Sequence, residues 1–195
     1  PTHIGVITSP STAAFQDILS TIKRRAPSSQ ISLSSAIVQG DTAASSLIKA
    51  LDRIIRFNDN NPDNSIDVVV ISRGGGSMED LWCFNNEDLA RQIAAFPIPT
   101  ISGVGHEIDF TICDFVSDMR APTPTASAEI VTEFSFQVYD KLNEIQSDLQ
   151  RSIKISLKDK LQKIQSLKGS IKSPLLVLRE QSQKIDSYEF KLKQN

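Results

Sequence analysis

The sequence contains few of the residues that build metal centres or covalent cross-links. Its 195 residues include two cysteines, two histidines and one tryptophan. Cys83 and Cys113 match no metal-binding spacing, which excludes zinc sites and disulfide scaffolds and predicts a reduced, cytoplasmic setting. No run of 18 or more apolar residues occurs, which excludes a membrane-spanning helix.

The chain also lacks an initial methionine and a signal-like segment. It begins Pro1-Thr2-His3, which predicts a fragment of a longer protein. The length suits one ordinary domain with an appendage, and the 39% of hydrophobic residues is enough for a packed core.

The net charge of −2 hides an asymmetry between two parts of the chain. Residues 126–195 contain 12 Lys and Arg against 9 Asp and Glu, whereas residues 1–125 contain 9 against 14. Binding to nucleic acid needs clustered cations that neutralise phosphates. An acidic first part is therefore a poor nucleic-acid binder, and if the protein acts on DNA, local cations or another domain must hold the strand.

Strand-like and helix-like segments alternate through residues 1–125. Strands are expected at 3–8, 31–38, 66–71 and 99–102, and helices at 14–25, 42–57 and 79–94. Such alternation predicts an α/β domain with an open, mainly parallel, doubly wound sheet and helices on both faces.

Residues 126–195 contain no strand pattern and predict a long helical tail. Apolar residues recur from Val131 to Leu167 with a period of about 3.6, as in a straight amphipathic helix. Gly169 indicates a helix stop, with Ser173 as an N-cap and Pro174 as the first residue of a second helix. We interpret the tail as a coiled-coil or hairpin segment whose apolar stripe needs a partner. A kinked continuous helix is the alternative.

Polar loops follow three of the predicted strands, at residues 9–17, 72–82 and 102–110. Because the carboxyl ends of parallel strands meet at one edge of a sheet, these loops predict an active site there. Asp17, near the first loop, has by itself the pattern of an ordinary exposed helix residue.

The second loop has the composition of an anion site. Arg73 is followed by Gly74, Gly75, Gly76 and Ser77. Consecutive glycine amides at the start of a helix can bind a phosphate or carboxylate beside the guanidinium. Neither a P-loop nor a dinucleotide-binding fingerprint is present.

The third loop places His106 close to two carboxylates, Glu107 and Asp109. If the segment is helical, His106 and Asp109 share a face, and Asp109 could orient an imidazole that acts as general acid or base. The spacing matches no HExxH metal motif.

Both loops also have a purely structural interpretation. Arg73 could pair with Glu79 or Asp80 in a tight strand–helix turn, and His106 could form a salt bridge at a helix N-terminus.

Long motifs in this chain resemble the exonuclease VII large-subunit family. The segment SRGGGSMEDLWCFNNEDLARQIAAFPIPTISGVGHEIDFTICDFVSDMRAPTPTASAEI resembles its catalytic region, as do GVITSPSTAAFQDILSTIKRRAP and VQGDTAA. The resemblance covers residues 3–133, and the tail is similar to the coiled-coil region that follows. Where the family usually has SPTGAAIRD, this chain has SPSTAAFQD, with Thr12 in place of glycine and Gln16 in place of arginine.

The resemblance implies a nuclease that hydrolyses single-stranded DNA from both the 5′ and 3′ ends to oligonucleotides with 5′-phosphates. The functional residues of the family fall on Asp17, Arg73, His106 and Asp109. Arg73 and the glycine loop would hold phosphate. The resemblance implies no required metal or cofactor; the alternative is a divalent metal such as magnesium among Asp17, Asp109 and Glu107.

The resemblance also implies a domain organisation and partners. Residues 1–125 would form the catalytic domain and 126–195 a truncated coiled coil, and an OB-fold that grips single strands would precede them in the full-length protein. Small subunits would bind the helical tail, and large subunits could also self-associate. Two alternatives are a non-catalytic module that binds anions or nucleic acid on a helical scaffold, and a small-molecule phosphoryl or glycosyl transferase.

Overall fold

The computed structural model describes residues 1–74, 78–105, 108–170 and 173–193. Contacts between residues divide the chain into two compact units, Pro1–Lys141 and Leu142–Asn195. The first contains a parallel sheet with helices on both faces, and the described part of the second is helical. The predicted class, α/β with a long helical tail, is confirmed.

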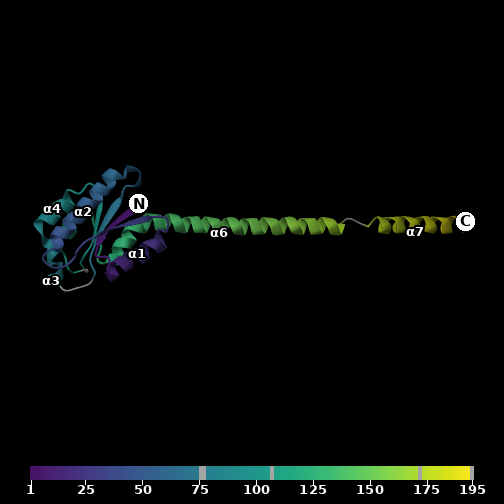
Figure 1. Ribbon diagram of the computed structural model, residues 1–195. Coiled ribbons are helices and arrows are strands. Elements are labelled where there is room, and N and C mark those ends of the chain that lie inside the picture. The colour runs from purple at the N-terminus through teal and green to yellow at the C-terminus, as the bar shows by residue number, and fades with distance from the viewer. Residues whose placement is uncertain (75–77, 106–107, 171–172, 194–195) are drawn as a thin grey trace. The chain divides into compact units, whose positions relative to one another are not determined.

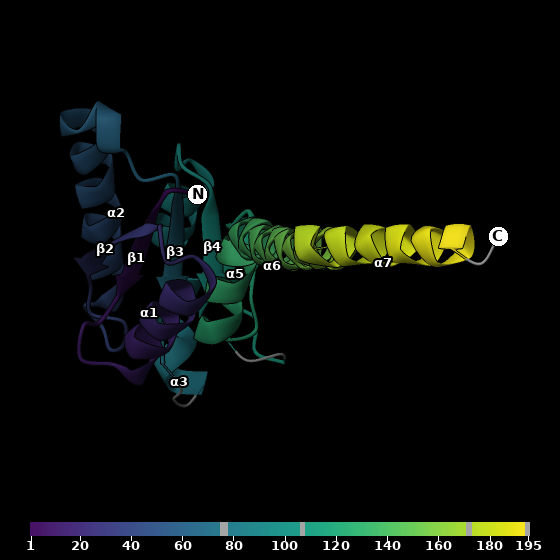
Figure 2. The ribbon, with the colours of Figure 1, turned by 90° about the vertical axis from the view of Figure 1, so that its right-hand side faces the viewer.

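The sheet has five strands in the order β2-β1-β3-β4-β5, and every neighbouring pair is parallel. The strands are β1 (His3–Thr8), β2 (Gln30–Ser35), β3 (Val68–Ser72), β4 (Thr100–Gly103) and β5 (Met119–Arg120). Figure 2 shows β2, β1, β3 and β4 side by side. The fifth strand was not predicted, because two residues are too few to form a recognisable pattern.

Helices cover both faces of the sheet. In the first unit they are α1 (Ala13–Arg25), α2 (Ala43–Asn60), α3 (Met78–Leu81), α4 (Glu87–Ala94), α5 (Ile112–Val116) and the start of α6 (Pro124–Ser170), with 3-10 turns η1 (Pro62–Asn64) and η2 (Trp82–Asn85). Helices α2 and α4 lie on one face, and α1 and the first turns of α6 lie on the other (Figure 1).

Alternate side chains of the central strands enter two separate hydrophobic cores. Ile7 and Ile71 belong to the core beneath α2 and α4, whereas Val6 and Val70 belong to the core beneath α1 and α6. All four are fully buried, and burial of such a side chain stabilises the fold by roughly 1.5–3 kcal/mol. Burial on both faces explains why the sequence of β3 is a continuous apolar run.

The single helix predicted over residues 79–94 is wrong. The segment is divided into α3, η2 and α4, because Asn86 starts a new helix. The side-chain oxygen of Asn86 accepts a hydrogen bond from the backbone N–H of Leu89 at 3.0 Å, and the backbone of Asn86 is extended. A residue with this conformation interrupts the helical hydrogen bonds, so the helix begins again at Glu87.

The helix stop predicted near Gly169 is confirmed. Helix α6 ends at Ser170, and α7 (Pro174–Lys193) has Pro174 as its first residue. The carbonyl of Ser173 accepts a hydrogen bond from the backbone N–H of Leu176 at 2.9 Å, as at the start of a helix. The helical hairpin stays a prediction.

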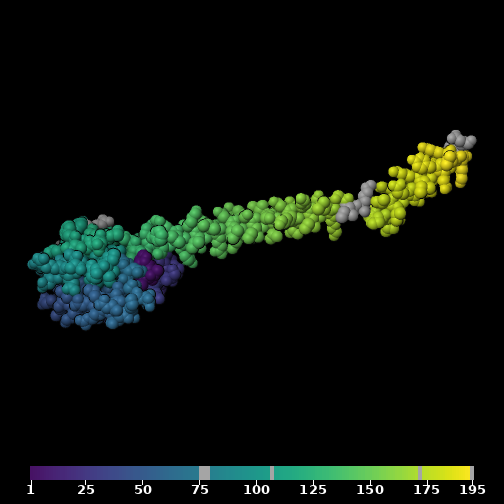
Figure 3. Space-filling model, turned by 90° about the horizontal axis from the view of Figure 1, so that it is seen from above, coloured from purple at the N-terminus to yellow at the C-terminus, as the bar shows by residue number. Residues whose placement is uncertain are grey.

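The apolar stripe of α6 is exposed beyond Lys141. Near its middle, Leu149, Ile153 and Leu157 have 60%, 50% and 56% of their surface exposed. Figure 3 shows the side chains along this part of α6 in green. Among the described residues, no helix has the length and apolar character needed to cross a membrane.

Candidate active site

The carboxyl ends of β1, β3 and β4 lie beside one another at one edge of the sheet. Ile7 is in register with Ile71, and Ser72 is in register with Gly103. The chain passes from β1 to β2 on one side and then to β3 on the other, so the strand order reverses between β1 and β3. Ligands of open α/β sheets bind in the crevice formed at such a reversal. Each of the three predicted site loops starts from one of these strand ends.

Arg73 leaves the end of β3 with its side chain buried. The guanidinium Nη2 lies 2.8 Å from Oδ2 of Asp80, and only 3% of the Arg73 side chain is exposed. The Arg73 backbone N–H and the Ser72 hydroxyl both donate to the carbonyl of Gly103, at 3.5 and 3.2 Å. These bonds hold Arg73 at the carboxyl end of β3. An anion that entered the site there would compete with Asp80 for the guanidinium.

Gly74 brings the loop after β3 next to the start of α1. A Cβ atom on Gly74 would lie 3.7 Å from the Cβ of Ala14, an ordinary van der Waals distance. The first and second site loops are therefore neighbours. Gly75, Gly76 and Ser77 lie outside the described residues.

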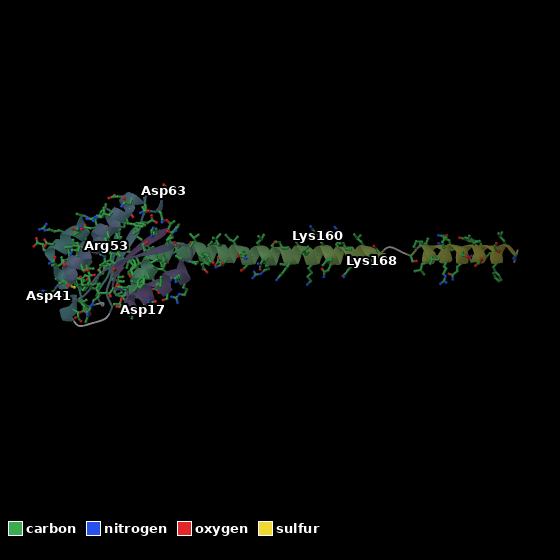
Figure 4. The ribbon with its side chains drawn as sticks, in the orientation of Figure 1. Asp17, Asp41, Arg53, Asp63, Lys160 and Lys168 are labelled. Carbon is green, nitrogen blue, oxygen red and sulfur yellow. The ribbon has the colours of Figure 1, made fainter. Side chains whose placement is uncertain are left out.

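Asp17 is exposed on α1, just beyond its first turn (Figure 4). Its backbone carbonyl accepts a hydrogen bond from the Ser20 hydroxyl at 3.0 Å. Thr12, which replaces the usual glycine of the family, precedes the helix with a φ of −88°, a conformation open to any residue. A threonine is therefore compatible with the backbone at the start of α1.

The loop after β4 folds back on itself at Gly105. A Cβ atom at Gly105 would collide with the backbone carbonyl of Asp109. The Asp109 residue is half-buried, and its carbonyl accepts a hydrogen bond from Nη2 of Arg120 at 3.3 Å. His106 and Glu107 lie outside the described residues, so the proposed pairing of His106 with Asp109 stays a prediction. Helix α5 begins only at Ile112, after Asp109.

Asp114 anchors this loop, a role that the motif search missed. Its carboxylate accepts hydrogen bonds from the Ser102 hydroxyl at 2.5 Å and from the backbone N–H and hydroxyl of Thr111 at 2.8 and 2.9 Å. The Asp114 side chain is 1% exposed. The spacing of Thr111 and Asp114 is that of a capping box, a signal that was present in the sequence.

Arg120, at the end of β5, is a second residue that sequence reasoning missed. Its guanidinium carbon lies 3.9 Å from the ring centroid of Phe110, and its Nε lies 3.9 Å from Oδ1 of Asp114. Together with the bond to Asp109, these contacts place a cation against the loop that contains His106. The two-residue strand β5, which positions Arg120, has no signature in the sequence.

Thr8 ends β1 with a buried hydroxyl that has no hydrogen-bond partner among the described residues. Buried hydroxyls are nearly always bonded to protein or water, so an unsatisfied one at the reversal of strand order indicates a place for a polar ligand or water. A threonine at the end of an apolar strand gave no signal by itself.

The two cysteines are free thiols, and burial disfavours the thiolate form of each. Burial raises the pKa of Cys83, against the opposing effect of the nearby Arg73. Burial, with a smaller contribution from Asp114, raises the pKa of Cys113 to about 12. A thiolate is the reactive form of cysteine, so burial makes both residues less reactive.

The described carboxylates do not assemble a metal site. No group of three or more His, Cys, Asp or Glu side chains in the described ranges is arranged to hold an ion. Glu107, one member of the alternative metal set with Asp17 and Asp109, lies outside those ranges.

Comparison with known proteins gives a consistent result along the whole chain. Residues 1–195 match the family model for the exonuclease VII large subunit. The chain is 43% identical over 189 residues to the exodeoxyribonuclease 7 large subunit of Geobacillus kaustophilus, a match that covers 96% of this chain and 41% of that protein. It is 43% identical over 195 residues to the corresponding protein of Vibrio parahaemolyticus, covering 99% and 43%.

The chain thus spans about two-fifths of the length of these curated relatives. The 43% sequence identity extends over nearly the whole length of the chain, and the family model matches it from end to end. The chain belongs to the exonuclease VII large-subunit family.

Proposed function

We propose that this chain forms the catalytic part of a single-strand-specific exodeoxyribonuclease. The enzyme would hydrolyse single-stranded DNA from both the 5′ and 3′ ends to oligonucleotides with 5′-phosphates. The observation that supports this function best is the meeting of three strand ends, which brings the Arg73 loop beside the loop that contains Asp109, in a chain of this family. The family match does not favour a binding module without turnover.

The proposed chemistry is attack of water on a phosphodiester. Arg73 and the amides of the glycine loop would bind the scissile phosphate and stabilise the charge that develops on its oxygens. The water oxygen would bond to phosphorus while the bond to the 3′ oxygen breaks, leaving a 5′-phosphate and a 3′-hydroxyl. His106, oriented by Asp109, would remove the proton from water or supply one to the leaving oxygen.

Asp17 would act from α1, whose start lies next to Gly74. In the proposal it positions the attacking water or the flanking nucleotide. No cofactor is required in this proposal, and a divalent metal such as magnesium bound by Asp17, Glu107 and Asp109 is the alternative.

Charge indicates that the catalytic unit does not hold DNA alone. Residues 1–125 contain 9 Lys and Arg against 14 Asp and Glu, so their affinity for single strands at physiological salt would be low. An OB-fold elsewhere in the full-length protein would supply the grip. Small subunits would cover the exposed stripe of α6, or copies of the large subunit would associate there. We place this enzyme in the cytoplasm.

The test is digestion of end-labelled single-stranded DNA by the full-length large subunit assembled with its small subunit. Substrates labelled at the 5′ end and at the 3′ end are digested with and without a chelator. Short products with 5′-phosphates from both substrates are expected, with unchanged rates in the chelator. Rates that fall to background in the chelator and recover with magnesium would favour the metal alternative, and intact substrate under all conditions would overturn the function.

A further inference from the structure

The only tryptophan of the chain lies on the surface beside the candidate site. Trp82 is 75% exposed, although neighbouring residues anchor the backbone in the core: Leu81, the last residue of α3, is 4% exposed, and Phe84 on η2 is fully buried. A large aromatic ring on a rigid support, held in solvent, has the form of a contact surface for another flat group.

Trp82 lines a cavity of about 630 Å³ between η2 and the start of α2. This volume is in the range of small-molecule sites. Asn85 and Asn86 line it from the η2 side, Asp41 lines it from the loop before α2, and Glu87 lines it from α4. Figure 4 labels Asp41 and so marks where the cavity lies on the first unit.

The polar groups of the cavity provide both donors and acceptors. The side-chain oxygen of Asn85 accepts from the backbone N–H of Ile112 at 2.8 Å, and that of Asn86 accepts from Leu89 at 3.0 Å. Because both oxygens are used in this way, both amides are held with their NH₂ groups available as donors. The carboxylates of Asp41 and Glu87 are acceptors.

The charges of the cavity disfavour a phosphate. Among the described residues that line it, none is Lys or Arg and two are acidic. The nearest cation described for these carboxylates is Arg91, whose Nη2 lies 2.7 Å from Oε1 of Glu87. An aromatic face with amide donors and carboxylate acceptors instead matches an uncharged heterocycle, which has a flat ring and a hydrogen-bonding edge.

The cavity adjoins the proposed phosphate site through one short chain of contacts. Cys83, in the cavity wall, contacts the carbonyl of Asp80 through its sulfur at 3.6 Å. Asp80 is the ion-pair partner of Arg73. A ligand that spans both places would present a flat ring to Trp82 and an anionic group to Arg73.

We propose that this cavity is a nucleobase subsite, in which a base of the single-stranded substrate stacks on Trp82 while a backbone phosphate lies at Arg73. The subsite rests on the proposed function and adds to it a fixed position for one base. Stacking is tolerant of sequence because every base has a π face, so the subsite would fit an enzyme that degrades strands of any sequence.

The test uses the fluorescence of Trp82, because the 195-residue chain contains no other tryptophan. The chain is titrated at low salt with a short oligothymidylate, and binding is followed in parallel by the anisotropy of a labelled oligomer. Saturable quenching of the tryptophan emission is expected over the same concentrations as binding. An abasic oligomer of equal length and charge is expected to bind more weakly and to leave the emission nearly unchanged.

Variants test whether the ring itself contributes to binding. Trp82→Ala should weaken oligothymidylate binding roughly 5- to 150-fold, as expected for the loss of one stacked base, whereas Trp82→Phe should retain most of the affinity. Phe134→Ala is the matched control, because Phe134 is an aromatic residue that is 74% exposed on α6. Its affinity should equal that of the wild type.

Three outcomes would overturn the subsite. Binding without quenching, or equal quenching by the abasic oligomer, would reject the subsite and leave a DNA substrate in place. Absence of binding at every concentration would also reject the subsite, whereas digestion of single-stranded DNA by the full-length enzyme tests the proposed function separately.

Discussion

Arg73 and Asp80 form an ion pair at the boundary between the core and solvent. Their side chains are 3% and 39% exposed. A buried guanidinium without a counter-ion is costly, so Asp80 stabilises Arg73 at the end of β3 when no anion is bound. A phosphate that replaced Asp80 would bind a cation whose position is already fixed.

Replacing Arg73 or His106 with alanine is expected to abolish cleavage. His106→Ala removes the proposed acid–base group and should lower the rate by about 10² to 10⁴. Arg73→Ala removes the main charge that would hold phosphate and should also abolish cleavage. Melting should change little in either case. For Arg73→Ala the reason is that Asp80 is partly exposed and can be solvated by water. Initial rates and thermal melting of the full enzyme are the measurements.

The matched control for these two variants is Asp63→Ala, which alters an exposed charged residue on η1 (Figure 4). Because η1 precedes β3 and Arg73 follows it, Asp63 lies before the opposite end of that strand. It should cleave like the wild type. A correctly folded His106→Ala enzyme with wild-type rates would contradict the assignment of His106.

Asp118 is expected to make folding stability depend on pH in the acid range. Hydrogen bonds from the backbone N–H and hydroxyl of Thr100, at 2.7 and 3.0 Å, lower the pKa of Asp118. A carboxylate with a lowered pKa stabilises the folded state above its unfolded pKa of about 3.9, and this contribution is lost as the pH falls through the folded pKa. In Asp118→Asn, the free energy of unfolding should therefore fall less steeply than in the wild type as the pH drops below about 4.

Urea unfolding of the wild type, Asp118→Asn and Asp63→Asn over a series of pH values measures this effect. The Asp63 variant should follow the wild type, since Asp63 is exposed on η1. Parallel curves for the wild type and Asp118→Asn would show that the carboxylate does not contribute.

At the scale of elements, the loop between β4 and α5 depends on a close backbone contact. Because a Cβ atom at Gly105 would meet the Asp109 carbonyl, Gly105→Ala must displace the loop that contains His106. We expect a loss of roughly 10- to 100-fold in cleavage rate, because displacement of catalytic groups by about 1 Å has such effects. The sheet should remain folded, as circular dichroism would show.

Gly169→Ala is the matched control for this glycine. A Cβ atom at Gly169 meets nothing within 4 Å, and the residue lies in α6. The change should leave cleavage unaltered and stabilise the helix by up to about 1 kcal/mol. Equal activities of the Gly105 and Gly169 variants would mean that the loop tolerates a shift.

At the scale of the whole molecule, the exposed stripe of α6 predicts an assembly surface. Ile153 is 50% exposed near the middle of the stripe, and burial of a side chain of this size stabilises a contact by roughly 1.5–3 kcal/mol. Ile153→Glu should therefore release small subunits or dissociate an oligomer while the α/β unit stays folded. Sedimentation of the assembled enzyme measures the subunit count.

Ser152→Glu is the control for the stripe, since it introduces the same charge about a quarter turn around the helix. Assembly of this variant should be nearly normal. An unaltered subunit count in Ile153→Glu would show that the stripe makes no contact with another chain.

The sequence by itself determined the class of the fold and the long helical tail. Local periodicity is sufficient for this, because a buried strand and an amphipathic helix have their pattern within one segment. The strand His3–Thr8 and the stop after Gly169 were predicted for that reason. Motifs in the loops also placed Arg73 and Asp109 at strand ends.

Only the tertiary structure decided which groups meet. The ion pair of Asp80 with Arg73 is seen only in the described contacts, and the pairing of β5 with β4 brought Arg120 to the His106 loop. The cavity beside Trp82 forms between segments about 40 residues apart in the chain. Contacts of this kind depend on strand order and on where each loop ends, and no local pattern encodes these features.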